Sequence, residues 1–164
     1  MIDLIPRNIQ PHFETTHQTK DGSSDIIKGA LTCCESHDFE VSAAGEIKHR
    51  AFSKMYLFPE NDKAAIEARC KKCGQVIPVF DSRSDGYEKC GKKTYARIPM
   101  KPVRCRKCQS GMFSVCIQYE YPDRQELDEL EIPEADRAFT WIWVTLRCSK
   151  CGAEYKNFVD CETG

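Results

Sequence analysis

Cysteine spacing constrains this chain more than any other feature of its sequence. The 164 residues contain 11 cysteines, and Cys-X-X-Cys pairs begin at Cys70, Cys105 and Cys148. An odd cysteine count, with no signal-peptide pattern in the first eleven residues, argues against an extracellular disulfide framework. No stretch approaches the roughly 18 apolar residues of a membrane-spanning helix. We therefore expect a cytoplasmic protein without a membrane role, whose reduced thiols are free to bind metal.

Two blocks of sequence recur in the same order along the chain. Cys34 to Val41 returns as Cys108 to Val115, and the six residues from Arg69 to Gly74 return with five identities as Arg147 to Gly152. An internal repeat of this kind outweighs any single motif. We interpret the chain as a duplication with the following parts: a polar and mostly irregular N-terminal arm (1–28), a first repeat (29–88), a basic linker (89–102) and a second repeat (103–164).

Apolar periodicity predicts a mainly β fold, built of two duplicated β modules. Apolar side chains alternate with polar ones from Phe113 to Tyr121, as in a half-buried strand. The run from Phe139 to Leu146 is aromatic and β-branched on both faces, which predicts a central strand. Trp141 and Trp143 lie two apart on it and are expected in the core, the alternative being a stacking surface. Shorter strands should follow the knuckles, at 76–80 and 155–159. One short helix is expected at 123–131, between Pro122 and Pro133 in the connection of the second repeat.

The second repeat carries two complete Cys-X-X-Cys pairs. A two-residue spacer lets one tight turn direct both sulfurs at the same ion. Antiparallel strands can then bring the two turns together, so that four thiolates surround one tetrahedral zinc. The predicted ligands are Cys105, Cys108, Cys148 and Cys151.

In these four cysteines, and in Gly152 after the last knuckle, the chain resembles the zinc-ribbon superfamily. The resemblance implies β-hairpins that carry zinc knuckles at their ends. It assigns no biological role, because zinc ribbons serve in nucleic-acid contacts, in protein docking and in structural support. The two knuckles are farther apart here than in compact ribbons, which predicts an inserted strand or helix.

The first repeat departs from the pattern, because Leu31 stands at the position that corresponds to Cys105. We prefer a site made of Cys34, His37, Cys70 and Cys73, in which Cys34 and His37 keep the two-residue spacer. Cys33 is the alternative ligand. It ranks second because the side chains of the adjacent residues Cys33 and Cys34 would point apart in an extended chain. Two zinc ions per chain are therefore expected, although four thiolates would also accept iron.

Three functions are compatible with these features. The first is a non-catalytic binding or adaptor module, held together by structural zinc, whose partner is a protein or a nucleic acid. The second is nucleic-acid binding through the basic segment 89–107, which would neutralise phosphates; alternatively, this segment pairs with the acidic stretch 120–136 of the same chain. Its candidate contacts are Lys92, Lys93, Arg97, Lys101, Arg104, Arg106 and Lys107.

The third is a zinc-dependent, deaminase-like hydrolase. Cys33-Cys34-Glu35, followed by the Cys70 pair, superficially matches the arrangement of a ligand, one residue, a general acid/base glutamate and a distant Cys-X-X-Cys. Arg69 stands where such enzymes carry proline, and the repeat explains the Cys70 pair without catalysis.

Overall fold

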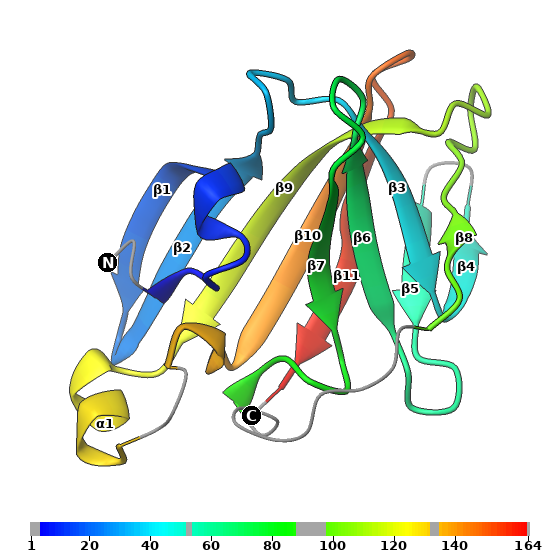
Figure 1. Cartoon of the computed structure of the whole chain (residues 1–164). Helices are drawn as coiled ribbons and strands as arrows, with labels where there is room; N and C mark the ends of the chain where they lie inside the picture. Colours follow the sequence, from blue (N-terminus) through cyan, green and yellow to red (C-terminus); the bar gives the residue numbers. More distant parts are fainter. Residues whose placement is uncertain (1–3, 52–53, 88–97, 132–134, 164) are drawn as a thin grey trace.

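The computed structural model describes residues 4–51, 54–87, 98–131 and 135–163, and these are mostly antiparallel β structure (Figure 1). The prediction of a mainly β protein is confirmed. Two 3-10 turns lie at Gln10–His12 and Ala135–Arg137, and one α-helix, α1, spans Arg124–Glu129. The strands are β1 (Phe13–Asp21), β2 (Ser24–Leu31), β3 (Phe39–Ala44), β4 (Glu46–Arg50), β5 (Lys54–Phe58), β6 (Ala65–Cys70), β7 (Val76–Asp81), β8 (Lys101–Pro102), β9 (Met112–Tyr121), β10 (Trp141–Cys148) and β11 (Glu154–Glu162).

One curled sheet contains all strands except the β4–β5 hairpin. Its main path runs β1-β2-β9-β3-β6-β7, while β10 pairs with β9 and β11, and β8 pairs with β3. The curl brings β7 across from the β9–β10 region, where the rings of Phe80 and Phe139 lie 6.2 Å apart (Figure 1). The apolar core fills the space inside this curl.

The strands predicted in the second repeat are present. Along β9 the buried side chains alternate with half-buried ones, as the two-residue period requires. β10 lies between β9 and β11 and is therefore a central strand. The expectation that Trp141 and Trp143 belong to the core is wrong, because the buried side chains of β10 are those at the alternate positions, such as Ile142 and Val144. Both tryptophans are half-buried on the opposite face of the strand.

The two halves of the sheet have the same local topology. In each, a strand that follows the first knuckle pairs with a strand that ends in the next knuckle: β3-β6-β7 and β9-β10-β11. Phe39 pairs with Cys70 in the first half, and Phe113 pairs with Cys148 in the second, which is the same register at the recurring positions. β3 and β9 also pair with each other, and there Phe39 lies opposite Phe113. The halves are thus joined in one sheet through this seam.

The N-terminal arm, expected to be irregular, contains the β1–β2 hairpin. β2 places Ile27 and Leu31 in the core, whereas β1 is exposed at every position after Phe13. The polar sequence of β1 gave no alternating pattern because the strand lies at the edge of the sheet with both faces toward solvent. Gly29 allows the two strands to approach closely, because an added Cβ there would lie 2.5 Å from the Glu14 carbonyl oxygen and would also meet the Phe13 ring.

Helix α1 confirms the helix expected near 123–131. It begins after Asp123, whose side chain accepts a hydrogen bond of 2.8 Å from the Gln125 N–H. Leu127 is its buried anchor. In the described ranges, no helix has the length and apolar character needed to cross a membrane.

Candidate metal centres

Three Cys-X-X-Cys turns share one backbone geometry. In each, the first cysteine N–H donates to the carbonyl five residues later, and its own carbonyl accepts from the N–H four residues later, with distances of 2.8–2.9 Å. The residue after the second cysteine has a positive φ: 75° at Gly74, 76° at Gly152 and 66° at Gln109. Glycine suits this left-handed position at two of the turns. The tight turn is what directs both sulfurs of a pair to the same side.

The second repeat brings its four predicted cysteines together. Cys105, Cys108, Cys148 and Cys151 have sulfurs that all lie within 4.8 Å of one another. The sulfurs of Cys105 and Cys151 are 3.6 Å apart, and those of Cys108 and Cys148 are 3.5 Å apart. Cys105 and Cys148 are buried, and the other two are partly accessible.

The first repeat forms an equivalent cluster in which Cys33 joins Cys34, Cys70 and Cys73. The Cys33 sulfur lies 3.6 Å from that of Cys73 and 3.9 Å from that of Cys34. Adjacent cysteines can converge here because Cys34 (φ 54°) and Glu35 (φ 60°) form a two-residue turn between Cys33 and Ser36. The preference for His37 assumed an extended chain at this point, and the chain is not extended here.

Cys33 occupies the structural place of Cys105. Its N–H donates to the Ser36 carbonyl (3.0 Å) as that of Cys105 donates to the Ser110 carbonyl (2.8 Å). The hydroxyl of each serine also accepts from the N–H two residues later, at 3.2 Å in both repeats. The first repeat is two residues shorter between these anchors. The alignment of Ser36 with Ser110 was a usable signal, because it places the missing residues inside the turn.

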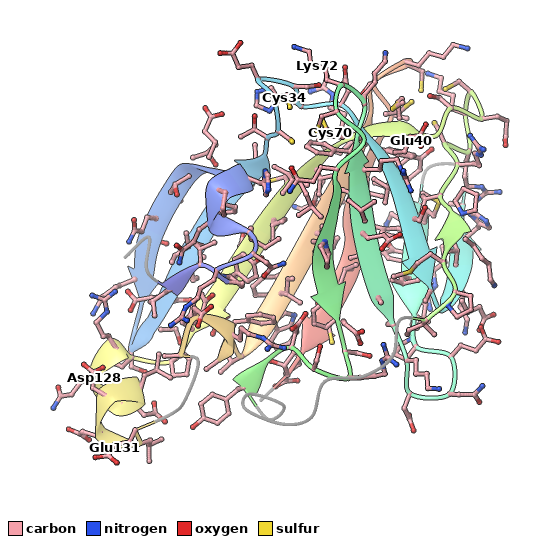
Figure 2. The ribbon with its side chains drawn as sticks, viewed as in Figure 1. Cys34, Glu40, Cys70, Lys72, Asp128 and Glu131 are labelled. Atoms are coloured by element: carbon pink, nitrogen blue, oxygen red, sulfur yellow. The ribbon has the colours of Figure 1, made fainter. Side chains whose placement is uncertain are left out.

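His37 and Glu35 lie outside the cluster of sulfurs. His37 is exposed, and its Nδ1 lies 3.3 Å from the Leu31 carbonyl oxygen. Glu35 is also exposed, at the tip of the turn. Figure 2 shows Cys34 and Cys70 together at the end of the sheet where the knuckles meet.

Hydrogen bonds and burial distribute charge unevenly among the sulfurs. Burial raises the pKa of the Cys33 thiol to about 12, and the N–H of Gln75 lowers that of Cys73 to about 7. In the second cluster burial opposes ionisation of Cys105, yet hydrogen bonds from the Tyr155 hydroxyl and from backbone N–H groups lower its pKa to about 6. Each cluster thus already favours one thiolate, and a cation would favour the others.

The separations of the sulfurs fit a tetrahedral metal ion. Four sulfurs at about 2.3 Å from a central ion lie about 3.8 Å from one another. Two sulfur–sulfur separations in each cluster fall between 3.5 and 3.9 Å, and all the others are within 4.8 Å. Both clusters could therefore hold a metal ion, with four sulfurs and no place for a substrate in the coordination shell.

The two clusters are linked across the seam of the sheet. The Ser149 hydroxyl, within the last knuckle, donates a hydrogen bond of 2.7 Å to the Asp38 carboxylate, which follows the Cys33–Ser36 turn. Backbone bonds repeat on each side: Lys71 N–H to the Asp38 carbonyl (3.2 Å), and Ser149 N–H to the Met112 carbonyl (3.0 Å). This hydrogen bond connects the last knuckle directly to the turn that carries the other cluster.

The basic residues predicted to contact nucleic acid divide into two groups. Lys92, Lys93 and Arg97 lie outside the described residues, and Lys101, Arg104, Arg106 and Lys107 are exposed. Arg104 lies over Gly111, where an added Cβ would be 2.7 Å from its Nη1. Arg106 donates from Nη1 to the Ala51 carbonyl at 3.0 Å.

Two adjoining hollows, of about 550 and 320 Å³, meet at Arg104 and Pro102. Arg69 lines the first, together with one carboxylate, Glu40, and His49 lines the second. Burial and the charge of Arg106 lower the pKa of His49. We call this surface the arginine groove; sequence reasoning missed Arg69 and His49 because they are distant from the basic segment in the chain.

Pairing of the basic segment with the acidic stretch 120–136 is absent from the described residues. Neither the described ion pairs nor the described hydrogen bonds connect residues 101–107 with residues 120–131 or 135–136. Figure 1 places β8 and α1 on opposite sides of the molecule, and Figure 2 shows Asp128 and Glu131 far from Lys72.

Comparison of this chain with protein-family models, with curated proteins and with solved structures found no match.

Proposed function

We propose that both cysteine clusters bind structural zinc and that the chain is a non-catalytic binding module built around them. The observation that carries this proposal is the gathering of four sulfurs in each cluster, all within 4.8 Å of one another. Zinc is preferred because four thiolates in a closed tetrahedral shell are its usual structural site. The ions hold the knuckle turns in place and stabilise the end of the sheet at which both halves begin.

A hydrolytic role for Glu35 receives less support. Such a role requires a zinc position open to water, with a carboxylate directed toward it. Here four sulfurs already complete the shell, and Glu35 is exposed at the tip of the turn. The resemblance to zinc ribbons is limited to the Cys-X-X-Cys knuckles.

Metal content tests the zinc proposal. Protein purified without added metal should contain about two zinc ions per chain, measured by elemental mass spectrometry. Protein in which cobalt replaces zinc should show the visible absorption of a tetrathiolate site. Cys116→Ser and Cys161→Ser, which change thiols outside both clusters, should retain both ions. Iron in place of zinc would correct the metal, and less than one ion of any kind would refute the proposal.

The arginine groove supports a second candidate, which is binding of a nucleic acid. Arg69, Arg104 and Arg106 line adjoining hollows, and Glu40 is the one carboxylate among the described lining residues. The knuckle lysines are weaker candidates, because a zinc ion with four thiolates carries two net negative charges that Lys71, Lys72 and Lys150 can offset.

Salt-dependent titration separates these contributions. Arg104→Gln with Arg106→Gln should weaken binding of a labelled single-stranded RNA by about tenfold or more and should reduce the slope of log affinity against log salt by about two. The matched pair Lys71→Gln with Lys72→Gln should change both much less. Equal losses in the two pairs would indicate general electrostatic attraction, and no binding by the wild type would exclude this candidate.

A further inference from the structure

A hollow at the opposite end of the sheet combines aromatic walls with carboxylates. Its volume is about 430 Å³, and it lies where β2 begins, β9 and β11 end and β10 begins. None of the described residues that line it is basic. We call it the aromatic–acidic pocket; its lining includes Tyr87, Glu120, Glu126, Thr140, Trp141 and Glu162.

The aromatic wall is held in position. The rings of Trp141 and Trp143 are stacked, with centroids 5.3 Å apart and planes 9° from parallel. Nε1 of Trp141 donates a 2.7 Å hydrogen bond to the Asp160 carboxylate. Trp141 is therefore supported by its neighbour on one side, and it lines the pocket as a preformed surface.

Tyr87 is fixed by a separate set of contacts. Its N–H donates to the Phe139 carbonyl at 2.9 Å and lies 3.2 Å from the Thr163 hydroxyl. The preceding residue, Gly86, has φ +102°, and an added Cβ would collide with the Thr163 side chain. Glycine at this position therefore permits the close approach that places Tyr87 beside the end of β11.

Three carboxylates frame the pocket. The sheet register places Glu120 and Glu162 on either side of Trp141, from β9 and β11 respectively, and Glu126 comes from α1. None of the three side chains has a hydrogen bond or ion pair with another described residue. Their charge is thus available to a ligand.

The geometry favours an organic cation over a metal ion. Within the described residues, only the cysteine clusters bring three or more ligand atoms within 4.8 Å of one another. The glutamates therefore surround a hollow instead of converging on a point. A cation beside an indole or phenol face is attracted by the ring, and nearby carboxylates strengthen the attraction.

We propose that the aromatic–acidic pocket binds an arginine or lysine side chain presented by a basic segment of a partner protein. The hollow offers an aromatic face, negative charge with no basic residue among its described lining, and hydroxyl acceptors such as Thr140. The site is independent of the cysteine clusters, so that it can be tested whether or not the metal proposal holds.

Tryptophan fluorescence gives a local readout, because the chain contains 2 tryptophans and both belong to the stacked pair. An acetylated and amidated peptide of alternating arginine and glycine should change the emission in a saturable way. A peptide of alternating glutamate and glycine should not. Absence of saturation with the arginine peptide would overturn the proposal.

Charge-matched variants test the pocket itself. Changing Glu120, Glu126 and Glu162 together to glutamine should weaken peptide binding about tenfold or more. The control changes Glu14, Glu60 and Glu154 to glutamine and removes the same charge elsewhere; it should stay within about twofold of the wild type. Equal losses in the two triple variants would mean attraction by net charge alone and would overturn a defined pocket.

Trp141→Ala separates ring recognition from charge. With near-ultraviolet circular dichroism and thermal unfolding used to verify the fold, this variant should also bind the arginine peptide about tenfold less tightly. The chain's own stretch 89–97 contains Lys89, Lys92 and Lys93 and is the rival occupant by charge. If changing these lysines to alanine tightens peptide binding about tenfold, the pocket serves the chain itself and not a partner.

Discussion

At the scale of single residues, the turn from Cys33 to Ser36 decides which side chains can reach the first metal centre. Its two central residues adopt a left-handed conformation, and neither is glycine. Such a conformation is costly unless other interactions require it. A metal ion held by both Cys33 and Cys34 would supply that requirement.

Exchanging the candidate ligands tests this ligand set. We expect His37→Ala to keep two metal ions and to change the free energy of unfolding by less than about 0.5 kcal/mol, as for other exposed positions. Cys33→Ser should bind one of the two ions more weakly, because three thiolates remain. Cobalt titration, followed by the sulfur-to-metal absorption, measures both effects. The reverse result would restore His37 as the ligand.

Asp85 gives a prediction for pH dependence. Burial raises its pKa above the ordinary 3.8, although the Asp81 N–H and the Arg137 guanidinium act in the opposite direction. The folded state therefore binds this proton more tightly than the unfolded state does. The stabilising contribution is complete below pH 3.8 and is lost as the pH rises through the folded-state pKa.

The stability of the wild type, measured relative to Asp85→Asn, should consequently fall as the pH rises from about 4 toward neutrality. The size of the fall is about 1.4 kcal/mol for each unit by which the pKa is raised. Urea unfolding at several pH values measures it. A wild-type stability that rose over this pH range, relative to that of Asp85→Asn, would contradict the assigned direction.

At the scale of elements, the β1–β2 hairpin depends on one close approach. Gly29→Ala would place a methyl group against the Phe13 ring and the Glu14 carbonyl. We expect a loss of about 1–3 kcal/mol in the free energy of unfolding, as for other overpacked positions. Lys28→Ala, the exposed neighbour on the same strand, should cost less than about 0.5 kcal/mol, and equal losses would show that the crowding at Gly29 is relieved without strain.

Sequence reasoning succeeded where one physical pattern dominated an element. The alternation from Phe113 to Tyr121 predicted β9, and the proline and acidic residues around Asp123 predicted α1. It failed for β1, because an exposed edge strand has no buried face and therefore no alternation of apolar and polar residues in its sequence. It also misplaced Trp141 and Trp143, because a run that is apolar on both faces does not say which face meets the core.

The same contrast holds for the candidate metal centres. Cys-X-X-Cys spacing identified Cys70, Cys105 and Cys148 as the starts of knuckles, since two-residue spacing already implies a turn. Cys33 was ranked below His37 because the residue types of Cys34 and Glu35 do not predict a left-handed turn. The arginine groove was only partly foreseen, because β3, β6 and the segment after β8 meet through the sheet and not through the sequence.

At the scale of the whole molecule, both halves share one sheet, and the knuckles contact each other across the seam. We therefore expect a single cooperative unfolding transition by calorimetry, instead of one for each repeat. Cys148→Ser should lower the midpoint of that transition and accelerate hydrogen exchange in β3 and β6 as well as in β10. Cys161→Ser, a thiol outside the clusters, should leave both close to the wild type.

Two separate calorimetric transitions, or protection in β3 and β6 that survives Cys148→Ser unchanged, would contradict this coupling. The result would then favour two independently folding modules. Chelation gives a parallel measurement, because removal of the ions should lower the same midpoint for the whole chain.

The pairing of Phe39 with Phe113 has a consequence for assembly. These residues occupy the same position in the two recurring blocks, and they face each other in an antiparallel pair, so the seam is complementary to itself. A half-length chain would carry one edge able to meet another copy of that edge about a two-fold axis. The geometry that joins two parts of one polypeptide is thus also a geometry in which two separate half-length chains could pair as a homodimer.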